Sequence, residues 1–192
     1  MLTTPGWDDT ERLGLEVLAA RHVAGPPPEP RRPDRPHPLA LDVNAAHGIA
    51  AVSFAIFDMY PDIARGWWCE AVTFSFRDGQ WCYAGGESDN STTPDPFSRP
   101  DRATNSVHGW CDWHSNGGLG EWTDDPPEER HTFFGIAPAG TARLTVTDAE
   151  GSARDLLITP WNGAYVAVVA GAHSTLTGYD RRGDVLGSLS FR

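Results

Sequence analysis

Lysine is absent from this chain of 192 residues, and all 15 of its basic residues are arginines. The absence excludes chemistry that needs a lysine amine, such as Schiff-base catalysis or the phosphate contact of a P-loop. Because 15 arginines stand against 26 acidic residues, the net charge is −11. A chain this acidic repels phosphate backbones and anionic lipids, so we expect neither nucleic acid nor a membrane among its partners.

Cysteine is scarce as well, and no apolar run approaches the ~18 residues of a membrane-spanning helix. Three cysteines are an odd number that provides no disulfide framework, and they suit a reducing compartment. Residues 1–22 lack the basic segment and the following apolar segment that mark a secretory signal. We therefore expect a cytoplasmic protein.

The first part of the chain, residues 1–38, is predicted to form a helix and a linker. Apolar residues at helical spacing favour a helix over residues 8–23, with Asp8 at its N-cap and Gly25 at its end. The proline-rich residues that follow are typical of a semi-rigid spacer. Residues 39–192 are predicted to form a single β-rich domain.

Residues 42–60 fit two patterns. The apolar residues between Ile49 and Ile56 suit both the spacing of a helix and the alternation of a strand. Asp42 can cap a helix and Pro61 can end one, so we favour a helix for this segment. In either conformation the segment belongs to the core.

A β-hairpin is predicted at the dipeptide Asp78–Gly79, because both central residues of a type I′ turn need a positive φ. This turn places Phe76 opposite Trp81 and Phe74 opposite Tyr83. Four aromatic side chains then share one face of the hairpin and form a packing surface.

Six short apolar or alternating runs follow between residues 131 and 190, with turn signals between them. At Asn162–Gly163 we predict a second type I′ turn, which pairs Trp161 with Ala164. The predicted fold class is mainly β or α+β. It is an antiparallel β-sandwich or partly open barrel with an N-terminal helix, a second helix if residues 42–60 are helical, and a long acidic loop.

The acidic loop, residues 86–130, is where we expect the functional site. It contains ten acidic residues and three tryptophans, and so much aromatic surface argues for an ordered loop that crosses the sheet. The loop is predicted to bind a protein partner, and the acidic balance favours a basic one. The predicted partner-binding residues are Trp110, Trp113, Trp122, Asp112 and Glu121.

The same loop contains a candidate zinc site. His108, Cys111 and His114 are ligand types at close spacing, and His131 or Asp112 is a candidate fourth ligand. Zinc motifs normally pair two separated groups of ligands, and only one such group is present, so hydrogen-bonded histidines and a buried Cys111 are the alternative. No catalytic residue can be assigned, because the GxSxG motif is missing and the acidic surroundings disfavour a reactive thiolate.

The sequence therefore predicts a non-enzymatic binding or regulatory protein. The first alternative is a zinc enzyme or metalloprotein that uses the histidines and the cysteine of the loop. The second alternative is a β-sandwich that binds a small molecule or a carbohydrate, with tryptophan side chains stacked on the ligand.

Overall fold

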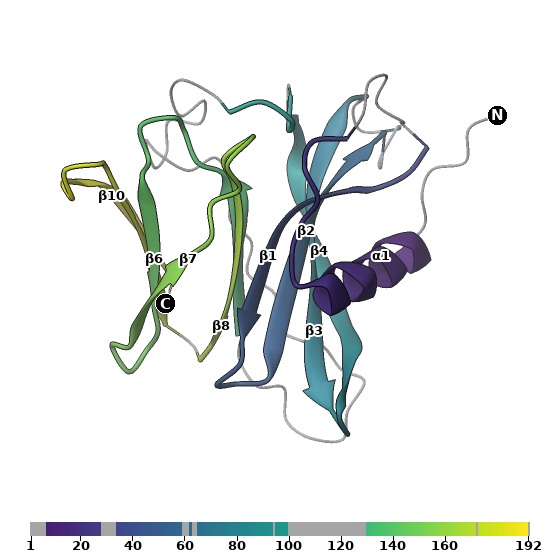
Figure 1. The fold of residues 1–192 in the computed structure, drawn as a ribbon, viewed down its shortest axis with the longest axis horizontal. Helices are drawn as coiled ribbons and strands as arrows, with labels where there is room; N and C mark the ends of the chain where they lie inside the picture. Colours follow the sequence, from purple (N-terminus) through teal and green to yellow (C-terminus); the bar gives the residue numbers. More distant parts are fainter. Residues whose placement is uncertain are drawn as a thin grey trace.

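The computed structural model describes residues 7–27, 34–58, 62, 65–93, 95–99, 130–171 and 173–191. These residues form one helix and ten strands (Figure 1), and the fold is mainly β with an N-terminal helix, as predicted. The elements are α1 (Trp7–Ala20), β1 (His37–Asn44), β2 (Ile49–Phe57), β3 (Trp67–Arg77), β4 (Gln80–Thr93), β5 (Arg130–Ile136), β6 (Arg143–Thr147), β7 (Ala153–Leu156), β8 (Ala164–Ala170), β9 (Ser174–Tyr179) and β10 (Val185–Phe191). In the described ranges, no helix has the length and apolar character needed to cross a membrane.

The strands form three antiparallel sheets. Sheet A has the order β1-β2-β3-β4, sheet B consists of β5 and β8, and sheet C has the order β10-β9-β6-β7. Figure 1 shows α1 in front of sheet A at the right and sheet C at the left, with β8 between them. Each of the six predicted runs in the C-terminal part contributes a strand, so local alternation and turn residues identified these elements correctly.

Sheet B is apolar on both faces because it lies between the other two sheets. Val166 and Val168 of β8 pack against residues of sheet A, whereas Tyr165 and Ala167 pack against residues of sheet C. All four side chains are buried. A strand covered on both sides needs no polar face, which explains the nearly continuous apolar sequence of β8.

The prediction of a helix over residues 42–60 is wrong, because residues 49–57 form β2. Both faces of sheet A are covered here: Ala50 belongs to the cluster beneath α1, and Ala51 to the cluster beneath sheet B. Every residue of β2 except Phe57 is therefore buried. A segment without a polar face shows no period that separates a strand from a helix.

The hairpin at Asp78–Gly79 is confirmed. The two turn residues have φ values of 51° and 81°, as a type I′ turn requires. Phe76 lies opposite Trp81, and Phe74 lies opposite Tyr83, in the predicted register. The rings of the first pair are 5.2 Å apart and those of the second are 6.3 Å apart, both in edge-on geometry.

The predicted type I′ turn at Asn162–Gly163 is wrong. The N–H of Thr159 donates to the carbonyl of Ala164, so residues 160–163 form a longer loop in front of β8. Asn162 is fully buried and donates from its side chain to the carbonyl of Pro96 at 2.9 Å. A contact with a distant segment of the chain therefore decides the conformation of this dipeptide.

α1 begins at Trp7 and ends at Ala20, three residues before the predicted end at residue 23. The next residue, Arg21, has a φ of 55°, and its N–H donates to the carbonyl of Leu18 at 3.2 Å. The left-handed residue that ends the helix is therefore Arg21 and not the predicted Gly25. The side chain of the predicted N-cap residue, Asp8, lies outside the described residues.

Asp42 of β1 connects the three sheets. Arg154 of β7 donates two hydrogen bonds to the Asp42 carboxylate, at 2.6 and 2.5 Å. The backbone N–H of Val168 in β8 donates a third at 2.9 Å. Arg154 also donates to the carbonyl of Val168, so one ion pair satisfies backbone groups as well. Because only 9% of the Asp42 side chain is exposed, water screens this pair weakly.

We predict that Asp42→Asn lowers the free energy of unfolding by about 3 kcal/mol, because the substitution leaves the Arg154 guanidinium without its counter-charge in a largely buried place. Urea unfolding followed by circular dichroism measures the change. Asp184→Asn is the matched control, because its side chain is 70% exposed and a change within about 0.5 kcal/mol is expected. Equal effects of the two substitutions would contradict the role assigned to Asp42.

Candidate binding groove

α1 packs on the outer face of sheet A through one side of the helix. Gly14, Val17 and Leu18 are buried there, above Val72 and Phe74 of β3. A side chain does not fit at Gly14, since a Cβ atom would lie 2.4 Å from Cζ of Phe74. The missing side chain thus permits the close approach of the helix to the sheet.

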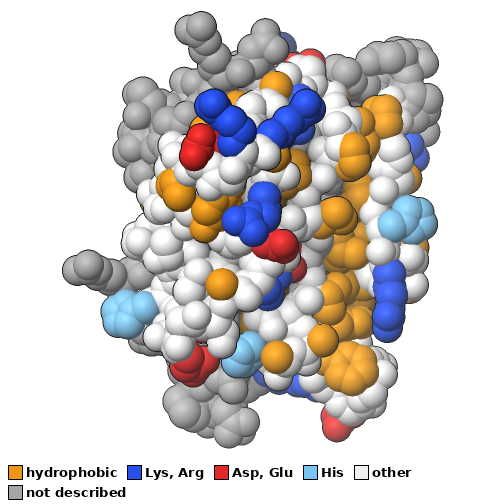
Figure 2. Space-filling model, turned by 60° about the vertical axis from the view of Figure 1, so that its left-hand side comes forward, with side chains coloured by type: hydrophobic (Ala, Val, Ile, Leu, Met, Phe, Trp, Pro, Cys, Tyr) orange, Lys and Arg blue, Asp and Glu red, His pale blue; other side chains and the backbone are white. Residues whose placement is uncertain are grey.

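The helix leaves part of this sheet face uncovered, and the uncovered part forms a groove of about 380 Å³ next to the C-terminal end of α1. Phe76 is 51% exposed and Val43 is 41% exposed, so two large apolar side chains are open to solvent within one groove. Figure 2 shows a band of hydrophobic side chains at its right-hand side. This side of Figure 2 corresponds to the front of Figure 1. The groove is lined by Leu18, Arg21, Leu41, Val43, Ala45, Gly48, Phe76 and Trp81.

Among the described residues that line the groove, one is charged, namely Arg21. Among the described residues, no carboxylate forms an ion pair with this guanidinium. An arginine at the edge of an apolar surface can donate two parallel hydrogen bonds to a carboxylate. The groove therefore combines apolar contact area with one site for a negative charge.

Glu70 of β3 lies on the same face of sheet A, within the apolar layer beneath α1. It is opposite Phe54 of β2 and two residues before Val72, both of which belong to the cluster packed against the helix. The residue is 0% exposed, and neither carboxylate oxygen has a hydrogen-bond partner in the described part of the chain. This burial raises the pKa of Glu70 from 4.5 to about 8.

Two further acidic groups lie in the same region. Tyr83 of β4 has a raised pKa, first because its phenol is partly buried and then because the charges of Glu70 and Glu11 oppose its ionisation.

Sequence reasoning missed Glu70, although one signal for it was visible: this acidic residue stands alone within the apolar run of β3. Perturbed acids of this kind gather at functional sites more often than elsewhere.

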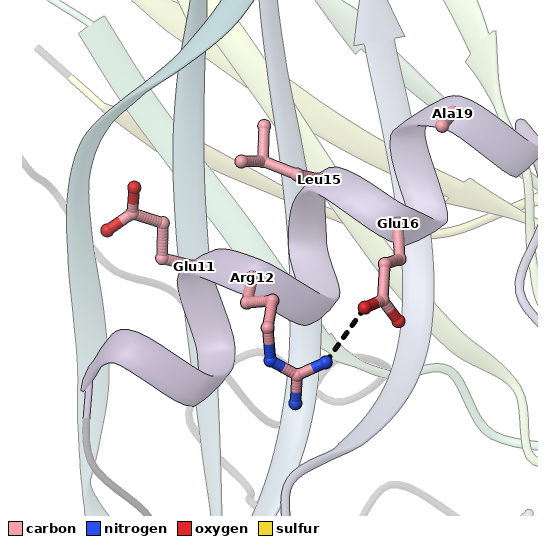
Figure 3. A pocket seen from close by; sticks show the side chains of 5 residues that line it. All are labelled: Glu11, Arg12, Leu15, Glu16 and Ala19. Atoms are coloured by element: carbon pink, nitrogen blue, oxygen red, sulfur yellow. Dashed lines mark hydrogen bonds and ion pairs between the residues drawn. The ribbon is translucent and has the colours of Figure 1, made fainter.

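A second hollow lies on the outer side of α1, and Figure 3 shows the side chains around it. Arg12 donates to Glu16 at 2.8 Å, while Leu15 points in another direction from the same helix. All the described residues that line it come from α1, and no second described element contributes to it. This hollow is a weaker candidate than the groove.

A polar hollow of about 220 Å³ lies between the β1–β2 turn and the β6–β7 hairpin. Two of its three charged residues have partners: Arg154 pairs with Asp42, and the carboxylate of Asp148 accepts the N–H groups of Glu150 and Ser152. The hydrogen bonds at Asp148 shape the hairpin loop, as expected for an Asx turn. The hollow therefore offers few free groups to a ligand.

All the partner-binding residues predicted from the sequence lie outside the described residues, and so do three of the four predicted zinc ligands. The fourth, His131, has a described backbone in β5 opposite Val169, but its side chain is not among those described. Within the described ranges, no group of three histidine, cysteine or acidic side chains comes together to hold a metal ion. The loop surface and the zinc site therefore stay predictions. The residues concerned are Trp110, Trp113, Trp122, Asp112, Glu121, His108, Cys111 and His114.

The described parts of the predicted loop are firmly attached to the rest of the protein. β4 continues to Thr93, so residues 86–93 belong to a strand. The ring of Phe97 is 4.8 Å from that of Trp67, and Arg99 donates hydrogen bonds to the carbonyls of residues 137, 138 and 141. Sequence reasoning missed this arginine, because its partners are about forty residues away in the chain.

Comparisons of the chain with protein-family models, with curated proteins and with solved structures find no match. Its function must therefore be argued from the geometry and chemistry of the described surface.

We predict that Gly14→Ala destabilises the protein by about 1–3 kcal/mol, because the added methyl group is forced against the buried ring of Phe74. At an exposed helix position the same substitution would stabilise by about 1 kcal/mol, so the sign of the effect reports on the packing of α1. Urea unfolding measures the change in the free energy of unfolding. Gly25→Ala is the control, since no atom lies within 4 Å of a Cβ at that position. A stabilising effect of Gly14→Ala would contradict the close packing of α1 on sheet A.

We predict that Glu70 makes stability depend on pH. The folded protein holds a proton that the unfolded chain releases between pH 4.5 and about 8, so the free energy of unfolding falls as the pH rises through this window and is level above it. The slope approaches about 1.4 kcal/mol per pH unit. Glu70→Gln removes this contribution, and urea unfolding of both proteins across the window measures it. A stability difference that stays constant with pH would disprove the prediction.

Proposed function

We propose that the protein is a non-enzymatic cytoplasmic binding protein that recognises a protein partner through the groove beside α1. The observation that carries this proposal is the exposed apolar surface of Phe76 and Val43 next to the guanidinium of Arg21, which has no ion-pair partner among the described residues. Exposed apolar surface of this kind marks interaction sites in proteins that are otherwise well packed.

The groove chemistry specifies the partner. Apolar side chains of the partner would fill the space between Leu41 and Trp81, and a carboxylate would pair with Arg21. The net charge of −11 favours a partner whose remaining surface is basic, because opposite charges steer the two molecules together. The acidic loop with Trp110 and Trp113 is a second contact surface in this proposal.

The test uses a displayed library of random linear peptides selected against the intact protein. We expect the selected peptides to be apolar and to contain an acidic residue. Phe76→Ser should weaken their binding by about tenfold or more, as the loss of an aromatic contact typically does. Arg21→Asn should weaken the acidic peptides similarly, and it preserves the helix end because asparagine tolerates a positive φ. Fluorescence polarisation measures the affinities.

Val185→Ser is the matched control, because Val185 is 61% exposed and lies on β10, outside the groove lining. This variant should bind the selected peptides as the wild type does. If no peptide is enriched, or if binding is insensitive to both groove substitutions, the groove is not the recognition site. Trp110→Ala and Trp113→Ala in the same assay test the loop surface separately.

A further inference from the structure

The groove and the buried acid are parts of one arrangement on the outer face of sheet A. Leu18 and Arg21, at the C-terminal end of the helix, form one wall of the groove. The same helix packs on Val72 and Phe74, which share the face of β3 with Glu70. Any event that lifts α1 from the sheet would therefore remove the wall of the groove and open to water the apolar layer in which Glu70 lies.

The contacts of α1 with sheet A are mainly apolar. Val17 and Leu18 join Val52 and Phe54 in one cluster, and the hydrogen bond between Arg12 and Glu16 stays within the helix on its outer side. These described contacts are apolar packing without directional bonds, and an element held mainly in this way can separate from the sheet without unfolding the sheets themselves.

The surroundings of Glu70 oppose a negative charge. The facing side chains of β2 are apolar, namely Val52, Phe54 and Ile56. Among the described side chains, the ionisable groups coupled to this region are Tyr83 on β4 and Glu11 on α1, and neither supplies a positive charge. The one basic residue of α1, Arg12, is paired with Glu16 and Asp9 on the exposed side of the helix. With respect to the described side chains, ionised Glu70 would thus lie in an apolar layer without a counter-charge, which is a costly arrangement.

We propose that the packing of α1 on sheet A is coupled to a proton on Glu70: the helix is held while Glu70 is protonated, and release of the proton favours release of the helix. As pH rises from acid to slightly alkaline, the helix separates more often, and the groove loses Leu18 and Arg21. The effect on binding rests on the proposed function of the groove, whereas the release of the helix does not. The protein would then bind its partner most strongly at low pH.

Hydrogen exchange of the α1 amides tests the coupling. Wild-type protein and Glu70→Gln are compared at each pH, so that the pH dependence of intrinsic exchange cancels in the ratio of their rates. We expect this ratio to rise with pH, by up to about tenfold per unit, and to level off above pH 8. Glu70→Leu, which replaces the acid with an apolar side chain of similar size, should behave as Glu70→Gln does.

Glu16→Gln is the matched control, since Glu16 is an exposed carboxylate of the same helix and its exchange ratio should not change with pH. A ratio that is independent of pH for Glu70→Gln and Glu70→Leu would overturn the proposal. The proposal would also fail if α1 amides exchanged only as slowly as those of β2, because the helix would then separate only when the whole protein unfolds.

The two proposals can fail independently. Phe76→Ser should abolish peptide binding and leave the exchange of α1 unchanged, because Phe76 lies in the groove at the end of β3. If the exchange ratio rises with pH but no peptide binds, the result supports the coupling of α1 to Glu70 and contradicts the proposed function of the groove. If peptides bind in the groove but the ratio does not change with pH, the result supports the function of the groove and contradicts the coupling.

Discussion

The carboxylate of Asp42 is the interaction on which the stacking of the three sheets depends. Strands β1 and β8 lie side by side, but they are not paired in a ladder. Side chains bond to backbone in place of a ladder: Asp42 and Asn44 reach Val168, and Thr159 reaches the carbonyl of Leu39. These bonds satisfy backbone groups that would otherwise be unpaired in the interior. They also cover the edge of β1, which would otherwise be open to pairing with another chain.

The two faces of sheet A are held in different ways. Toward sheet B, apolar packing is combined with the directional bonds of Asp42. Toward α1, the described contacts are largely apolar, and the buried carboxylate of Glu70 weakens rather than strengthens the layer. An element held mainly by apolar packing belongs to the less stable part of a protein, from which moving parts are drawn. The groove lies on this face, so its shape depends on the helix that we propose to separate from the sheet.

Local signals in the sequence identified most helices and strands but not which of these elements pack against one another. The Asp78–Gly79 hairpin follows from the φ values of two residues, so its register could be predicted. The strand β2 could not be predicted, because it is buried between α1 and sheet B and has no polar face. Without a polar face, its sequence does not alternate between polar and apolar residues. Asn162 could not be predicted either, since its hydrogen bond to the carbonyl of the distant Pro96 replaces the type I′ turn that the local sequence favours.

The sequence by itself determined the acidic charge, the N-terminal helix, the turn at Asp78–Gly79 and the short strands of the C-terminal part, because each of these depends on composition or on residues close together in the chain. Only the tertiary structure decided that Asp42 meets Arg154, that Glu70 is buried without a partner, and that Phe76 remains exposed in a groove. Burial and charge pairing depend on which distant segments pack together. Such contacts leave no periodic trace in the sequence.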